Sequence, residues 1–538
     1  MRGSSTIGEQ GTAVNHLWRR TCAVVLTLGL AASWGLQAET LRLAYRSDVA
    51  TLDPQGLRET FTTEFLASIM EPLVRYDRRL QPEPALAERW ERLSPTLWRF
   101  YLRRNVTFSN GNRFTADDVL FTFRRGSHPT SPLRGNISGI VNIAKVDDYT
   151  VEVETDGPYP LLLRELTSML IFDLEWVEEN GAAATANPGR EGGGFLARNI
   201  LGTGPFVVQR YQPGAECVLT SNPNWWDNPN KTHNLTEVRF QPLRSDATRV
   251  AALVSGQVDL ILSVPLQDID RIRRTPGIRV LEKPSLRTLM IGMNVASTKL
   301  RNGIPNPFKD IRVREALYRA VDIDTIVSKV MRGRATPASA IIGEGVNGYD
   351  PRLEGRIPYD PARAKKLLAE AGYSEGFTVG LECPNDRYVN DEAICTSLVG
   401  MFAKVGVRVN LRAQTKARYF QEILGGSPDL FVFGWASADT LDAQSYLKDI
   451  LHTRGGAKGS FNIGRYSNPR IDALEPLASR ESDPAKRRDL IRQAFQLHKD
   501  DIAHIPLHSQ QVIWAARSNI EALQIPLDAI WLRFVRIR

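Results

Sequence analysis

The stretch CPNDRYVNDEAIC, residues 383–395, combines residue types that could bind a metal, carry a redox centre or close a loop. Its cysteines, Cys383 and Cys395, flank several acidic and amide side chains and the pair Arg387 and Tyr388. A zinc site needs further soft ligands, and no CxxC motif or histidine lies near this pair. We therefore predict a disulfide between Cys383 and Cys395 if the protein folds in an oxidising compartment.

The histidine cluster HKDDIAHIPLH gives little support for a metal site. His504 and His508 lie four residues apart, but Pro506 between them breaks the helix that would place both rings on one face. The chain also lacks a nucleophile elbow, a P-loop and an HExxH motif. GTGPF at residues 202–206 is too short and has no lysine for a phosphate loop, so we expect a turn there. These motifs predict no catalytic residue, no metal and no cofactor.

Two segments carry complete helix signals. In RFTADDVLFTFRRG, Thr115 and Asp118 have the spacing of a capping box, which explains the adjacent acids without a catalytic role. In YDPARAKKLLAEAGY, Asp360 precedes Pro361 at the first helical position, and Gly372 follows the last apolar residue. Both segments are predicted to be helices with structural roles only.

Alternating and continuous apolar runs predict strands. ETLRLAYR places Leu41 and Leu43 on one face, as in a half-buried strand, and residues 151–154 alternate valine with solvent-facing glutamate. DLFVFGW is predicted to be a short buried strand that delivers Trp435 and Asp439 to the loop beyond it. Ligands commonly bind at loops beyond the carboxyl ends of such strands.

Residues 1–38 have the layout of a cleaved secretory signal peptide. The basic pair Arg19–Arg20 precedes the apolar run 21–36, which is shorter than the roughly 20 residues that span a bilayer. We predict export and cleavage, with the twin-arginine route as an alternative to the general one. The mature chain, residues 39–538, then folds in an oxidising compartment, where Cys217 remains as a free and buried thiol.

The composition limits the classes of partner. The formal net charge is +8, and the basic residues are mixed with acids along the chain instead of forming a block, which argues against nucleic acid. A mature chain of this length suggests roughly three lobes. The 10 Trp, 14 Tyr and 20 Phe are sufficient to form aromatic walls around a small ligand.

Seven segments occur in the order typical of one protein family. They are ATLDPQ, IMEPLVRYD, PALAERWERL followed by WRFYLRRNVTFSNGNRFTADDVLFTFRR, GTGPFVVQRYQPG with SNPNWWDN, LVSGQVDLI, DIRVREALYRAVDID and YDPARAKKLLAEAGY. Together they resemble the peptide/nickel-type extracellular solute-binding proteins of ABC importers, family 5, across essentially the whole mature chain.

The resemblance implies an α/β, periplasmic binding protein-like fold with two lobes that close on a hinge and three structural subdomains. Lobe I is expected to comprise about residues 39–80, 204–287 and 508–538, subdomain II about 81–203, and lobe III about 288–507. Ligand binding would favour the closed form, which the membrane transporter would recognise.

The resemblance also implies a charge pair for the two ends of a peptide. Asp439 in GWASADTLD matches the aspartate that holds the amino group, and Arg387 approximately matches the arginine that meets the carboxylate. The usual glycine-aspartate-proline run does not follow Asp439, so Asp442 is an alternative for the amino group. The other expected ligand contacts are Tyr388, Trp435 and Asn294.

Each of these assignments has a structural alternative. Arg387 could be a surface arginine paired with a neighbouring acid, and Trp435 could belong to the core. If the loop does reach the ligand, the Cys383–Cys395 bridge would hold Arg387 and Tyr388 in place before the ligand arrives.

The predicted function is that of a monomeric periplasmic receptor for a small peptide or peptide-like solute, which delivers it to the inner-membrane permease subunits of an ABC importer. Among binding proteins, the alternative is a receptor for a non-peptide solute, such as an opine, a sugar conjugate, a nickel chelate or haem. An exported hydrolase is the alternative from another class, because a catalytic triad need not be close in sequence.

Overall fold

The computed structural model describes residues 1, 3, 39–184, 194–438 and 440–538. Except for residues 1 and 3, the predicted signal segment lies outside these residues, as does Asp439. Residues Thr40–Arg538 form one unit. No helix within the described residues is long and apolar enough to span a membrane.

An eleven-stranded sheet runs through this unit, with strand order β15-β14-β16-β12-β17-β11-β1-β10-β9-β8 and with β13 paired to β17. Its strands are β1 (Thr40–Tyr45), β8 (Phe206–Gln212), β9 (Glu216–Ser221), β10 (Glu237–Pro242), β11 (Leu260–Leu262), β12 (Ile278–Met293), β13 (Ala335–Pro337), β14 (Phe377–Pro384), β15 (Val407–Gln414), β16 (Leu430–Trp435) and β17 (His504–Arg517). The long antiparallel strands β12 and β17 connect the two halves of this sheet.

Strand β1 confirms the predicted strand but is more buried than its sequence suggests. Leu41 and Leu43 pack in one apolar cluster, while Ala44 packs in another on the opposite face. β1 pairs in parallel with both β10 and β11, so neither edge is free. Both faces of this strand are therefore covered, instead of one.

A four-stranded antiparallel sheet lies between β1 and β8 in the chain. Its order is β4-β5-β7-β6, formed by β4 (Ala87–Ser94), β5 (Leu97–Leu102), β6 (Ile140–Asp147) and β7 (Thr150–Thr155). Helix α3 (Ala116–Gly126) begins at the predicted capping box of Thr115 and Asp118. The Asp118 carboxylate also accepts the Leu174 backbone N–H at 2.9 Å, and burial raises the pKa of Asp118 to about 6. The structural interpretation of this acid is confirmed.

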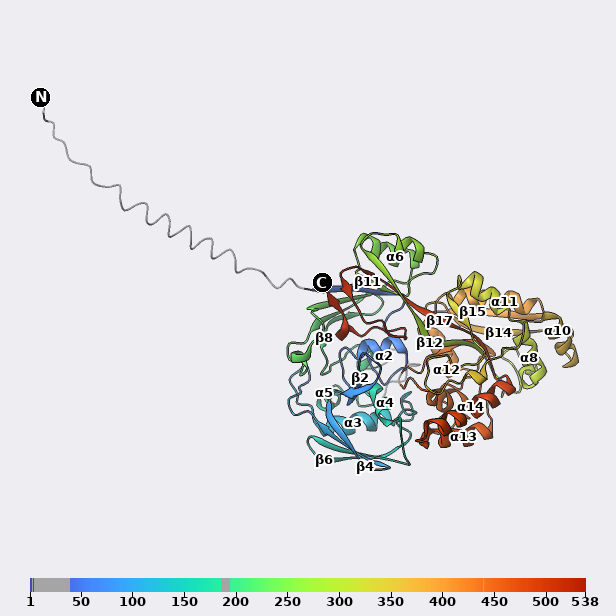
Figure 1. Cartoon of the computed structure of the whole chain (residues 1–538), viewed down its shortest axis with the longest axis horizontal. Coiled ribbons are helices and arrows are strands. Elements are labelled where there is room, and N and C mark those ends of the chain that lie inside the picture. The colour runs from blue at the N-terminus through green and yellow to red at the C-terminus, as the bar shows by residue number, and fades with distance from the viewer. Residues whose placement is uncertain (2, 4–38, 185–193, 439) are drawn as a thin grey trace. The chain divides into compact units, whose positions relative to one another are not determined.

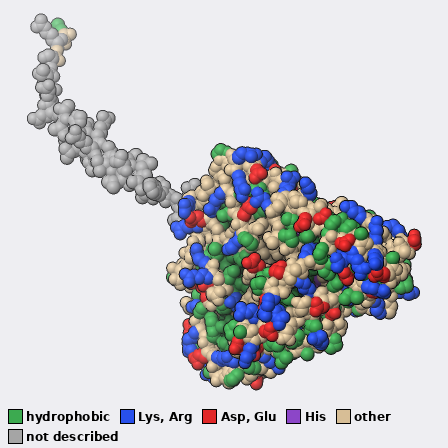
Figure 2. Space-filling model, turned by 45° about the vertical axis from the view of Figure 1, so that its right-hand side comes forward, with side chains coloured by type: hydrophobic (Ala, Val, Ile, Leu, Met, Phe, Trp, Pro, Cys, Tyr) green, Lys and Arg blue, Asp and Glu red, His purple; other side chains and the backbone are tan. Residues whose placement is uncertain are grey.

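The remaining elements surround the two sheets (Figure 1). The helices are α2 (Thr60–Leu66), α4 (Leu162–Glu165), α5 (Leu174–Glu179), α6 (Asp246–Ser255), α7 (Ile269–Arg273), α8 (Ile311–Ala320), α9 (Ile323–Thr325), α10 (Pro361–Glu370), α11 (Asp391–Ala403), α12 (Lys416–Gly425), α13 (Pro469–Arg480) and α14 (Pro484–Asp501), with short ribbons β2 (Val74–Tyr76), β3 (Pro82–Pro84), β18 (Ile520–Glu521) and β19 (Arg536–Ile537). As predicted, Asp360 caps α10, and Gly372 follows it with a φ of 89°. On the face in Figure 2, acidic and basic side chains are interspersed.

The three cysteines in the described residues are buried in the fold, and so are His504 and His508. Cys383 at the end of β14 is bonded to Cys395 in α11, with a Cα–Cα distance of 6.6 Å, as predicted. Cys217 is free and buried, and burial raises the pKa of its thiol to about 12. His504 and His508 lie in strand β17, and burial lowers the pKa of each to about 4, so both rings are neutral near pH 7.

Candidate functional site

A cavity brings together segments that are far apart in the chain. Its wall includes helix α2 and the residues before it, the end of β16, the loop that carries Arg387 and Tyr388, and the C-terminal residues Trp531 and Arg533. Leu133, Thr167, Ser168 and Leu170 add to the wall from the chain section that contains the four-stranded sheet. Side chains from many separate stretches of sequence thus line one cavity.

Aromatic rings form much of the wall, as the composition suggested. Trp435, at the end of β16, lies 4.9 Å from the Phe461 ring between centroids, and both line the cavity. The indole N–H of Trp435 donates to Ser445 Oγ at 2.9 Å, and the Arg58 guanidinium lies 5.4 Å from the Trp435 ring. These contacts fix the Trp435 ring as a rigid apolar surface on the cavity wall.

Arg387 and Tyr388 also line the cavity, and both are buried. The Arg387 guanidinium lies 3.2 Å from Glu59 and 3.1 Å from Asp528. The Tyr388 hydroxyl accepts the backbone N–H of Gly434 at 2.9 Å, which ties the loop to strand β16. The surface alternative for Arg387 is therefore wrong, because Arg387 is buried and its ionic partners, buried Glu59 and partly buried Asp528, come from other segments and not from its neighbours in sequence.

Glu59 connects Arg387 to a second cation. Its carboxylate lies 3.1 Å from the Lys416 ammonium and also accepts the backbone N–H of Thr62 at 3.0 Å, at the start of α2. Burial by itself would raise the pKa of Glu59, but Lys416 and Arg387 outweigh it, and the pKa is well below its usual value. Glu59 is consequently ionised over the whole physiological range.

A third cation, Arg287 of β12, completes the group. Its guanidinium lies 3.7 Å from Asp528, which also accepts the hydroxyl of Tyr45 at 2.7 Å. We name Arg287, Arg387, Lys416, Glu59 and Asp528 the cationic cluster. Linked by contacts within 4 Å, this cluster has three positive and two negative groups, so it has a net positive charge.

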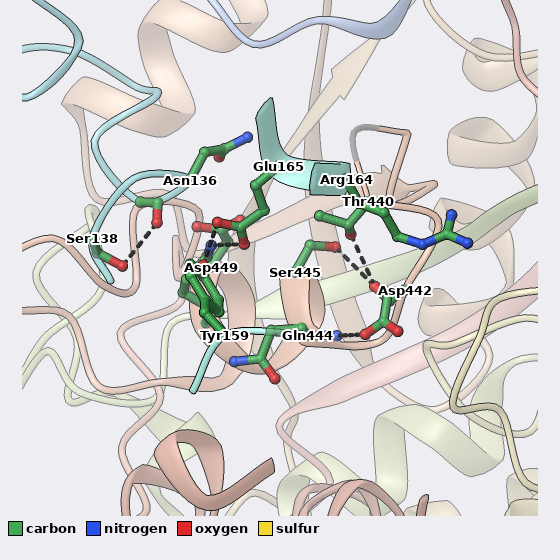
Figure 3. A network of polar contacts seen from close by, with 12 residues as sticks. Asn136, Ser138, Tyr159, Arg164, Glu165, Thr440, Asp442, Gln444, Ser445 and Asp449 are labelled. Carbon is green, nitrogen blue, oxygen red and sulfur yellow. Dashed lines mark hydrogen bonds and ion pairs between the residues drawn. The ribbon is translucent and has the colours of Figure 1, made fainter. Parts of the chain in front are cut away.

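Two of the predicted contact residues are located elsewhere. Asp442 does not line the cavity: its fully buried carboxylate is held by Arg487 at 2.6 and 2.9 Å and by the Asn347 amide, and Figure 3 shows it beside Gln444 and Ser445. Asn294 is buried outside the wall, where its side-chain oxygen accepts the Ser297 N–H at 3.0 Å. Asp439 lies outside the described residues.

Glu71 and Arg75, in the segment IMEPLVRYD, line the cavity although sequence reasoning used them only as family markers. Glu71 accepts the indole N–H groups of Trp225 at 3.1 Å and Trp226 at 2.8 Å, and burial raises its pKa. Arg75 lies 2.7 Å from Asp227. In the sequence, the signal for this part of the wall was that charged residues in IMEPLVRYD and tryptophans in SNPNWWDN occur within family motifs.

The disulfide lies directly next to the loop with Arg387. Replacing both Cys383 and Cys395 by alanine is expected to lower the free energy of unfolding by about 3 kcal/mol, because the bridge restricts the unfolded chain. Ligand affinity should fall as well, because the bridge joins the strand before this loop to the helix after it. Calorimetry and denaturant unfolding measure the two effects, with Cys217→Ala as the control. Unchanged affinity would limit the bridge to a structural role.

Residues 81–458 match the model of bacterial extracellular solute-binding proteins, family 5 middle. The chain is 25% identical to the glutathione-binding protein GsiB of Salmonella choleraesuis over 96% of this chain and 97% of that protein. It is 28% identical to the heme-binding protein A of Haemophilus influenzae over 79% of this chain and 78% of that protein. The solved structure of MoaA from A. tumefaciens R10 with mannopinic acid has a TM-score of 0.82 and 25% identity, covering 93% of this chain and all of that one.

These similarities confirm the predicted fold class, an α/β fold like that of periplasmic binding proteins. The family match covers well over half of the chain. It contains all four strands of the four-stranded sheet and the loop with Arg387. The chain therefore belongs to family 5 of the bacterial extracellular solute-binding proteins.

Proposed function

We propose that the protein is a monomeric periplasmic receptor that binds a small peptide or peptide-like solute and delivers it to the inner-membrane permease of an ABC importer. One observation supports this most: Arg287, Arg387 and Glu59 of the cationic cluster line an aromatic cavity. A buried site of net positive charge favours a ligand with a carboxylate, which every unmodified peptide carries. The name of the glutathione-binding relative fits the same ligand class.

The proposed mechanism is capture by closure. We assign lobe I to about residues 39–80, 204–287 and 508–538, with 81–203 and 288–507 as the other two subdomains. The cavity wall takes residues from all three sections, so a ligand there would contact each of them. Contacts of this kind stabilise the closed arrangement over an open one.

For a peptide, the carboxylate end would face the cationic cluster and an apolar side chain would pack on Trp435. Arg387 and Tyr388 remain our proposed residues at the carboxylate end, and Asp439, from sequence alone, remains the proposed partner of the amino group. An N-acetylated peptide should then bind more weakly than the free one.

A non-peptide solute is the second candidate. The aromatic wall would also accept a planar or cyclic organic acid. One relative is named for heme, and the structure of MoaA contains mannopinic acid. The relatives considered above are solute receptors by name, which supports a role without catalysis.

Titration calorimetry with glutathione, dipeptides and their N-acetyl derivatives tests the ligand class, and product analysis of the same mixtures tests for hydrolysis. Micromolar or tighter binding of free peptides with intact recovery is expected. Steady release of hydrolysis products would contradict the receptor function. Binding of an organic acid alone would favour the second candidate.

A further inference from the structure

Arg287 differs from Arg387 in how its charge is balanced. Arg287 is only 3% exposed and lines the cavity. Its one ionic contact with the described residues is at 3.7 Å from Asp528, longer than a hydrogen bond. Asp528 is also bound more closely by Arg387 at 3.1 Å and by the Tyr45 hydroxyl at 2.7 Å. The carboxylate near Arg287 is therefore largely engaged by other donors.

The hydrogen-bond donors of Arg287 are also incompletely used. One terminal nitrogen donates to Thr60 Oγ1 at 3.1 Å. The Nε–H is buried and has no hydrogen-bond partner among the described residues, which is also true of Arg387, so the longer ionic contact is what distinguishes Arg287. A buried guanidinium with an unused donor and a distant counter-ion is energetically unfavourable unless another acceptor approaches it. Burial and the neighbouring charge of Arg387 both lower the pKa of Arg287, in agreement with this geometry.

The fold makes room for this guanidinium at Gly434 of strand β16. A Cβ atom at Gly434 would lie 2.9 Å from Arg287 Cδ and 3.0 Å from Tyr388 Cε1. The Arg287 guanidinium is also 5.8 Å from the Tyr388 ring centroid. The absence of a side chain at Gly434 thus allows Arg287 to lie beside Tyr388 at the cavity wall.

We propose that Arg287 is the direct partner of an anionic group of the ligand, and that the bound solute must be an acid. Arg387, proposed above for the same carboxylate end, then contributes less to binding than Arg287, because Glu59 and Asp528 already balance most of its charge. This inference rests on the proposed function and makes it narrower: the carboxylate end of a peptide meets Arg287. A solute without an acid group is rejected because Arg287 would keep only its distant contact with Asp528 to balance its charge.

The first test uses glutathione, Ala-Ala and Gly-Glu, each compared with the same peptide converted to its C-terminal amide. In the unmodified protein, the acid form of any peptide that binds should bind at least about tenfold more tightly than the amide. In Arg287→Met this ratio should fall to about one, and Arg287→Lys should restore part of it. A ratio that Arg287→Met leaves unchanged would overturn the proposal.

A second test does not depend on the identity of the solute. Without ligand, Arg287→Met should unfold at the same denaturant concentration as the unmodified protein or a higher one, whereas Arg387→Met should unfold at a lower one. Acetate in place of chloride at constant ionic strength should stabilise the unmodified protein and not Arg287→Met. If Arg287→Met is destabilised as much as Arg387→Met, Arg287 is a structural ion-pair residue and the proposal is wrong.

These outcomes separate the two levels of the proposal. If no peptide binds but acetate stabilises the protein through Arg287, the peptide class fails while the anion partner stands. Gly434→Ala provides a further check, because it displaces Arg287 without removing its charge. The ratio of affinities for the acid and amide forms of a peptide should then fall. An unchanged ratio would contradict the placement of the ligand's anionic group beside Arg287.

Discussion

Replacing Arg387 by methionine is expected to lower the free energy of unfolding by about 3 to 5 kcal/mol, because it removes one of the two cations that balance buried Glu59 and the close cation of Asp528. Glu59 and Asp528 lie 3.2 and 3.1 Å from this guanidinium. Glu59 keeps Lys416 in the variant, but Asp528 keeps only the Tyr45 hydroxyl and the distant Arg287. Denaturant unfolding of the ligand-free protein measures the loss.

The pH dependence of this variant provides a second observable. The lowered pKa of Glu59 contributes stability above its usual value of 4.5, and this contribution is lost as the pH falls toward the folded-state pKa. Without Arg387 that pKa rises, so the variant should lose less stability on acidification below pH 4.5 than the unmodified protein.

Arg89 offers a matched control, because its guanidinium pairs with Glu91 on the surface at 2.6 Å with both side chains about half exposed. Arg89→Met should leave the unfolding midpoint within experimental error, since an exposed pair contributes little. If Arg387→Met and Arg89→Met have equal midpoints of denaturant unfolding, the ion pairs of Arg387 in the cationic cluster do not stabilise the folded protein.

Replacing Lys448 by methionine is the second large change we expect, again of about 3 to 5 kcal/mol, and it should also weaken ligand binding. The Lys448 ammonium lies 2.5 Å from Glu165 of α4, and both side chains are buried. The hydroxyl of Tyr159 also donates to Glu165, and Figure 3 shows Tyr159 and Glu165 close to Asp449. The Asp449 carboxylate lies 3.0 Å from Arg58.

This pair joins the section assigned to subdomain II with the section assigned to lobe III. If the sections separate on opening, the pair exists only in the closed form, and its loss should raise the dissociation constant at least about tenfold. A double-mutant cycle with Glu165→Gln isolates the coupling between the two side chains.

Arg480 and Asp156 connect the same two sections at 2.9 Å, but both are about half exposed. Arg480→Met should therefore change stability and affinity by less than about 1 kcal/mol. If Lys448→Met has no larger effect than Arg480→Met, the buried pair does not contribute to closure.

Local features of the fold were predictable because their causes are local. The capping box at Thr115, the cap at Asp360 and the strand at residues 430–435 each depend on side chains within a few positions of one another. The double burial of β1 was not predictable, because it depends on β10 and β11, which come some two hundred residues later in the chain.

In the candidate site, too, residues with a local sequence signal were predictable and residues that depend on distant segments were not. Arg387, Tyr388 and Trp435 were named from sequence and line the cavity, since they belong to short motifs at the ends of strands. Glu59, Arg287 and Asp528 were missed because no local pattern distinguishes a buried charge from a solvated one. Asp442 has the right residue type and position, but Arg487 binds its carboxylate from a distant helix.

The most direct test of the receptor function is native mass spectrometry of the mature protein as purified, followed by release and identification of any bound molecule. We expect one small acidic solute per chain, recovered intact and lost from Arg287→Met. A protein that carries only neutral solutes, or that converts an added solute into products, would contradict the central claim that this chain captures an acidic solute without chemical change.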